Sequence, residues 1–159
     1  MAGAAMRLRD ISPYAAGNTG VPYVWSFKGV APGPHVMVNA LTHGNEPAGM
    51  WAVTRLLDEG LRPARGRLTM ALATVAAYGR LFAGAAGVWR FVDRDLNRIW
   101  SDAWLAADRS SSEAARAREL RPIIREVDAL LDLHTTAYVA RPFLVIAEFA
   151  KTRALADRM

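Results

Sequence analysis

The 159-residue sequence predicts an α/β protein of three layers, α/β/α, with helices on both faces of a mostly parallel or mixed central sheet. Nearly continuous apolar runs at 35–41, 68–75 and 129–133 are typical of buried strands in a sheet that is covered on both faces. Helical patterns separate these runs, and strands that alternate with helices favour parallel pairing. The length suits one domain with its own core, so we treat residues 1–159 as a single domain.

The first half of the chain is expected to form three strands, at 22–28, 35–41 and 68–75, and one helix. Residues 22–28 alternate and are rich in β-branched and aromatic side chains, which predicts a strand. Two glycines and two prolines at 29–34 indicate a turn before the apolar run. Pro47 suits the first turn of a helix over 48–58, and Gly60 is a typical residue just after a helix end.

A long loop is expected to open the second half of the chain. After the apolar run that ends at Val75, the sequence predicts a long loop at 76–90 and a helix at 113–127. A strand at 142–147 and a final helix at 148–159 are expected to follow the apolar run at 129–133. Serines at 110–112 are good capping residues for the first of these helices. Pro122 is expected to kink or divide that helix, because proline removes a backbone donor.

Composition excludes several classes of function. The net charge is +5, but the arginines are spread along the chain and mostly interleaved with acids, so no nucleic-acid partner is expected. There is no cysteine, and a bound metal must therefore use His, Asp and Glu. No run approaches the roughly 20 apolar residues of a membrane span, and the N-terminus lacks a signal-peptide pattern. We expect a cytoplasmic protein without a membrane partner.

Unusual polar residues follow the ends of the predicted strands. His43 and Glu46 come after the strand that ends near Leu41, and His134 follows the strand at 129–133. Ligands of open α/β sheets bind outside the carboxyl ends of the strands, where these side chains are expected to meet. Two histidines and one carboxylate suit a single catalytic zinc ion, because three protein ligands leave a fourth position for water. The alternative is a chance His-x-x-Glu spacing and a capped or surface histidine.

Further polar residues have similar pairs of interpretations. Asp132 lies on the same strand face as His134, so it is expected to accept a hydrogen bond that fixes the histidine tautomer, or else to pair with backbone or arginine. Arg90, Asn97 and Arg98 form a candidate anion-binding group, and one arginine near zinc would stabilise an oxyanion. Their alternative is a solvated surface. Asp93 and Asp95 are expected to hold this loop together, and His35 to be exposed.

Three motifs follow one another along the chain, with Arg90 placed before the second of them. They are His43-Gly44-Asn45-Glu46, Asp95-Leu96-Asn97-Arg98 and Asp132-Leu133-His134-Thr135-Thr136. Together these motifs resemble the succinylglutamate desuccinylase/aspartoacylase family of the zinc carboxypeptidase-like superfamily, and the resemblance spans about residues 35–136.

The resemblance implies a carboxypeptidase-like fold and hydrolysis of the amide bond of an N-acyl amino acid or related small molecule. It assigns zinc ligation to His43, Glu46 and His134. It further implies that Arg90 stabilises the oxyanion and that Asn97 and Arg98 recognise a substrate carboxylate.

The sequence departs from the family pattern in two places. The family often has an Asn-Pro pair before the loop that carries Arg90, where this chain has Ala76 and Ala77. The family's general base is a Glu several dozen residues beyond the third zinc ligand, and Glu148 comes too soon to match it. We therefore expect a truncated, N-terminal portion of a longer enzyme that binds zinc but hydrolyses poorly. Its exposed apolar surface would favour a homo-oligomer.

Two other functions stay open at this point. The first is a zinc-binding domain without catalytic activity, suggested by the missing Glu. The second is a metallocarboxypeptidase that acts on peptides, because capture of a carboxylate by arginine suits either substrate class.

Overall fold

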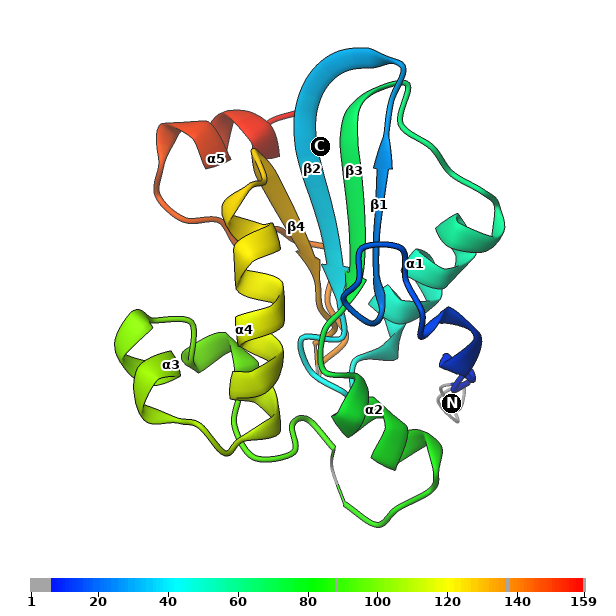
Figure 1. Cartoon of the computed structure of the whole chain (residues 1–159), viewed down its shortest axis with the longest axis vertical. Coiled ribbons are helices and arrows are strands. Elements are labelled where there is room, and N and C mark those ends of the chain that lie inside the picture. Colours follow the sequence, from blue (N-terminus) through cyan, green and yellow to red (C-terminus); the bar gives the residue numbers. More distant parts are fainter. Residues whose placement is uncertain (1–6, 88, 137, 159) are drawn as a thin grey trace.

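The computed structural model describes residues 7–87, 89–136 and 138–158. Its sheet has four strands in the order β1-β3-β2-β4 (Figure 1). The strands are β1 (Val24–Lys28), β2 (Ala31–Ala40), β3 (Arg65–Leu72) and β4 (Ala129–Leu133). β2 pairs in parallel with both β3 and β4, whereas β1 runs antiparallel to β3. The prediction of a mixed, mostly parallel sheet is confirmed.

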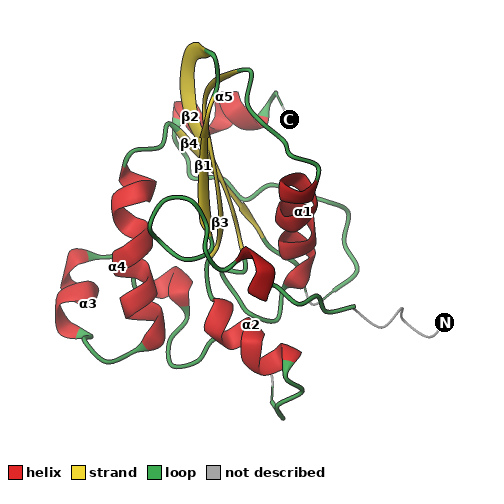
Figure 2. Ribbon diagram, turned by 45° about the vertical axis from the view of Figure 1, so that its right-hand side comes forward, coloured by secondary structure: helices red, strands yellow, loops and turns green. Residues whose placement is uncertain are grey.

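Helices cover both faces of this sheet. They are α1 (Pro47–Asp58), α2 (Val75–Phe82), α3 (Asp102–Ala107), α4 (Ser112–Arg125) and α5 (Ala150–Ala156), with 3-10 turns η1 (Ser12–Tyr14) and η2 (Leu96–Arg98). Figure 2 shows the sheet almost edge-on, with α1 on one side and α4 on the other. The three-layer architecture is thus confirmed. No helix of the described residues has both the length and the apolar character to cross a membrane.

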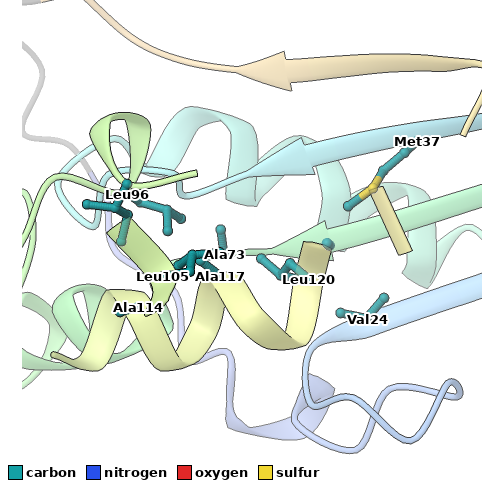
Figure 3. Packing of buried hydrophobic residues seen from close by; sticks show 10 residues of the cluster. Val24, Met37, Ala73, Leu96, Leu105, Ala114, Ala117 and Leu120 are labelled. Carbon is teal, nitrogen blue, oxygen red and sulfur yellow. The ribbon is translucent and has the colours of Figure 1, made fainter. Parts of the chain in front are cut away.

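The core has two parts because side chains of a strand alternate between faces. On β3, Met70 and Leu72 lie in the cluster on the α1 side, together with Met50 of α1. Ala71 faces the other way, into the cluster where Leu120 of α4 is fully buried (Figure 3). Burial on both faces explains why the end of this strand, residues 70–72, is apolar throughout.

Two predictions of secondary structure were wrong. The predicted loop at 76–90 begins with helix α2, whose Ala77 and Tyr78 are fully buried. The Tyr78 hydroxyl accepts a bond from Arg9 N (2.8 Å) and donates to Arg9 O (2.6 Å), so a distant segment stabilises this short helix. The predicted strand at 142–147 is not formed, and its large apolar residues are exposed. Strand propensity without a pairing partner does not make a strand.

Other boundaries differ by a few residues. β2 already begins at Ala31, within the predicted turn, and its pairing with β3 shifts register before His35. Helix α4 runs through Pro122 without a break, because Leu120 and its neighbours pack against the sheet on the same side. α3 was not predicted, and the final helix is confirmed over the shorter range of α5.

Candidate metal centre

A constrained turn carries the first two residues of the candidate site from β2 into α1. Leu41 is fully buried and has a φ of 55°, a left-handed conformation that is uncommon for leucine. Backbone N–H groups just beyond β3 hold the turn: Ala73 donates to Ala40 O (2.8 Å) and Thr74 to Leu41 O (2.7 Å). The Thr74 hydroxyl also donates to Thr42 O at 2.8 Å. The carboxyl end of β3 therefore positions the turn that presents His43.

The two histidines and the carboxylate meet at the carboxyl ends of β2 and β4. His43, Glu46 and His134 each offer a ligating atom, and these atoms lie within 4.8 Å of one another. His43 Nδ1 lies 2.9 Å from Glu46 Oε1, and His134 Nδ1 lies 2.9 Å from Glu46 Oε2. His43 and Glu46 are buried, whereas the His134 side chain is 34% exposed. This cluster of His43, Glu46 and His134 is thus open to solvent on the side of His134.

A carboxylate contacts the other ring nitrogen of each histidine. His134 Nε2 lies 2.8 Å from Asp132 Oδ2, and His43 Nε2 lies 3.2 Å from Asp95 Oδ1. Asp132 in turn accepts a hydrogen bond from Asn39 Nδ2 at 2.8 Å. In metal sites such outer carboxylates fix the tautomer and ring orientation of ligand histidines. Both Nδ1 atoms are thereby turned towards Glu46.

Electrostatics favour negative charge at the centre of the cluster. Burial alone would raise the pKa of Glu46, but hydrogen bonds from His134, from His43 and from the Thr135 N–H hold that pKa well below its usual range. Contacts with Asp132 and then with Glu46 raise the pKa of His134 to about 10. Three carboxylates thus contact two imidazoles, and His43, Glu46 and His134 form a group that could hold a metal ion.

Arg90 belongs to the segment of residues 90–98, called here the arginine loop, and reaches the cluster. Its Nη1 donates to Glu46 Oε1 at 3.0 Å, and its Nε lies 3.6 Å from Asp95 Oδ2. The Arg90 carbonyl accepts a bond from Gly44 N at 2.9 Å, which joins the loop to the His43 turn. The side chain is 41% exposed, so part of the guanidinium faces solvent beside the cluster.

Asn97 and Arg98 follow Asp95 closely in sequence, but their side chains do not join the cluster. Both are exposed residues of η2, directly after Asp95. Asn97 N donates to Asp95 Oδ1 (2.9 Å), and the Arg98 guanidinium donates to Asn97 O (3.2 Å). In the part of the chain that the structure describes, neither side chain bonds to the three ligating groups.

Asp95 is the site residue whose contact the sequence did not predict. We expected it only to hold the loop together, whereas it contacts both His43 and Arg90. Its position in a run too polar for a core was the available signal. His35 also differs from expectation, because it is half-buried and its Nε2 lies 2.8 Å from Thr69 Oγ1.

Asp95→Asn is expected to weaken zinc binding by about tenfold, since outer partners of ligand histidines typically contribute that much. The amide keeps the size of the side chain but removes the charge that faces His43. Zinc affinity measured by competition with a chromophoric chelator tests this. Asp102→Asn, at a side chain that is 84% exposed, is the control. Equal affinities in the two variants would show that Asp95 does not orient His43.

Comparison with known proteins places this geometry in context. Residues 32–156 match the model of the succinylglutamate desuccinylase/aspartoacylase catalytic domain. A comparison with curated proteins gives no match.

Similar solved structures include a succinylglutamate desuccinylase from Chromobacterium violaceum, with 24% identity and a TM-score of 0.54. The match covers 72% of this chain and 37% of the desuccinylase. Murine aminoacylase 3 is 32% identical, with a TM-score of 0.52, and the match covers 65% of this chain and 35% of the aminoacylase. A succinylglutamate desuccinylase/aspartoacylase from Rhodobacter sphaeroides is 26% identical, with a TM-score of 0.53, and the match covers 70% of this chain and 32% of that protein. The chain spans about a third of the length of these relatives.

Proposed function

We propose that this chain, which belongs to the succinylglutamate desuccinylase/aspartoacylase catalytic-domain family, carries the zinc-binding part of a hydrolase that cleaves the amide bond of an N-acyl amino acid or related small carboxylate. One observation carries the proposal: His43, Glu46 and His134 converge from two strand ends onto one point. Arg90, a candidate for stabilising negative charge on substrate, contacts the same carboxylate.

The donor set fits zinc in type and size. Two imidazole nitrogens and one carboxylate oxygen are the ligands of many catalytic zinc sites. Ligand atoms about 2 Å from a zinc ion are separated by about 3–4 Å, and the three groups here lie within 4.8 Å of one another. When bound, zinc supplies a Lewis acid for the acyl carbonyl and makes water more acidic.

The arginine loop would recognise and polarise the substrate. The guanidinium of Arg90 has five N–H donors, of which one bonds to Glu46, so others are available for the carbonyl oxygen on which negative charge develops. Arg98 and Asn97 are exposed and follow Asp95, which contacts His43, and their donors would hold the substrate carboxylate.

No residue of this chain is assigned as the general base. Glu148 is exposed and lies just before α5, and among the described residues the acids that contact the two histidines are Glu46, Asp95 and Asp132. We therefore expect the chain to bind one zinc ion and to hydrolyse slowly. This same observation favours the second candidate function, a zinc-binding domain that is not catalytic.

Removal of metal tests the proposed function. The chain, and separately any longer product of its gene, is assayed on N-acetyl and N-succinyl amino acids and on short peptides, before and after treatment with a chelator. Activity on acyl amino acids that disappears with chelator and returns with zinc supports the deacylase. A preference for peptides would favour a carboxypeptidase, and full activity without metal would exclude zinc dependence. Size-exclusion chromatography of the same samples tests the expected homo-oligomer.

A further inference from the structure

Glu113, in the first turn of α4, is a buried carboxylate that binds the backbone of the arginine loop. The residue is 1% exposed. Its Oε1 accepts a hydrogen bond from Val92 N at 2.7 Å, and its Oε2 accepts from Asp93 N at 3.0 Å and Arg94 N at 3.1 Å. The sequence suggested only a helix-capping role for this region.

The energetics of this contact make it a strong constraint on the loop. A buried carboxylate is unfavourable unless it is hydrogen-bonded, and charge-assisted bonds to N–H groups are the stronger kind. The residues between Arg90 and Asp95 form no helix or strand, so their N–H groups have no regular backbone partners. Glu113 supplies partners for three consecutive N–H groups, and the conformation of this part of the loop therefore depends on α4.

The segment that Glu113 holds lies between the two loop residues that contact the candidate metal ligands. Arg90 precedes it and bonds to Glu46, while Asp95 follows it and contacts His43. A second bond, from Ser112 N to Asp93 Oδ2 at 2.8 Å, runs between the same two segments.

The next turn of α4 is bonded to the sheet end that supports the His43 turn. Arg116 Nη2 donates to Leu72 O at 2.9 Å, and its Nε donates to Ala73 O at 3.0 Å. The N–H of Ala73 in turn holds Ala40 O at the end of β2. Successive turns of one helix face thus bind the arginine loop and the end of β3, so α4 fixes both relative to each other.

We infer that Glu113 is a positioning residue of the metal centre: through the backbone of residues 92–94 it holds Arg90 and Asp95 against Glu46 and His43. A role of Glu113 in catalysis rests on the proposed function. The contact between Glu113 and the loop is tested by measurements that need no enzymatic activity.

Glu113→Gln is the variant of choice, because the amide keeps the size of the side chain and turns an NH2 group towards backbone donors. Glu119→Gln, on the same helix at an acid that is 49% exposed, is the matched control. Amide hydrogen exchange is expected to be about tenfold faster at residues 92–94 in Glu113→Gln. Exchange at buried β2 amides is expected to stay unchanged. Zinc affinity of the 159-residue chain is expected to fall about tenfold.

The outcomes separate this inference from the proposed function. Wild-type exchange rates at 92–94 together with wild-type zinc affinity in Glu113→Gln would overturn the inference. If that variant does not fold, Glu113→Asp decides, since it keeps the charge on a shorter side chain. Faster exchange confined to the loop supports the inference in that case, and unchanged exchange overturns it. A wild-type chain that binds no zinc would remove the proposed function, whereas the exchange comparison would still show whether Glu113 holds the loop.

Discussion

His43→Ala and His134→Ala are each expected to weaken zinc binding by about a thousandfold or more. Each substitution removes one of the three ligating groups that lie within 4.8 Å of one another, and the two that remain hold a cation poorly. Isothermal titration calorimetry and metal analysis of the purified variants measure the effect.

His35→Ala is the matched control for these two variants. His35 is the remaining histidine of the three in the chain, and it lies in the middle of β2, whereas the cluster lies beyond the carboxyl end of that strand. The control is expected to bind zinc like the wild type. Unchanged zinc stoichiometry in both His43→Ala and His134→Ala would remove the central claim about this site.

Gly44→Ala is expected to destabilise the fold by about 2–3 kcal/mol, the upper range for overpacking in a tight interior. A Cβ at this position would lie 2.6 Å from both Ala77 Cβ and Tyr78 N, where α2 packs on the His43 turn. Because a backbone atom is among the contacts, the turn itself must move, and the geometry of His43 and Glu46 moves with it. Chemical denaturation measures the stability, and zinc titration measures the second effect.

Gly79→Ala is the control, and it is expected to change the stability of the fold in the opposite direction. Gly79 lies in the same helix α2, and a Cβ there would meet nothing within 4 Å. Alanine in a helix is favoured over glycine by about 0.5–1 kcal/mol, so this variant is expected to be more stable than the wild type. Equal stability of the two variants would mean that α2 does not constrain the turn.

Much of the fold follows from local patterns in the sequence. A parallel strand that is covered on both faces must be apolar on both, and this requirement makes the carboxyl-terminal halves of β2 and β3 visible as nearly continuous apolar runs. The apolar run at 129–133 does form β4, but the prediction that this strand is buried was wrong, because β4 is the last strand in the sheet order and Leu130 is 42% exposed. The carboxyl ends of parallel strands share one edge of the sheet, and for this reason His43 and His134 were expected to meet although they are far apart in sequence. The structure does bring them together on Glu46.

The wrong predictions share a different physical cause. α2 is only eight residues long, and it is stabilised by contacts with Arg9 from the N-terminal segment. Residues 142–147 have the composition of a strand, but no described strand pairs with them. Both outcomes depend on distant partners, which a local pattern does not contain.

The same distinction applies to the candidate metal centre. The sequence by itself determined which residues can ligate a metal and at which edge of the sheet they meet, because residue chemistry is a local property and the carboxyl ends of parallel strands share one edge. Only the tertiary structure decided that Asp95 faces His43, and that Glu113 holds the loop carrying Arg90. These contacts join segments brought together by packing of α4 on the sheet, and the side-chain directions that make them are set by that packing rather than by sequence spacing.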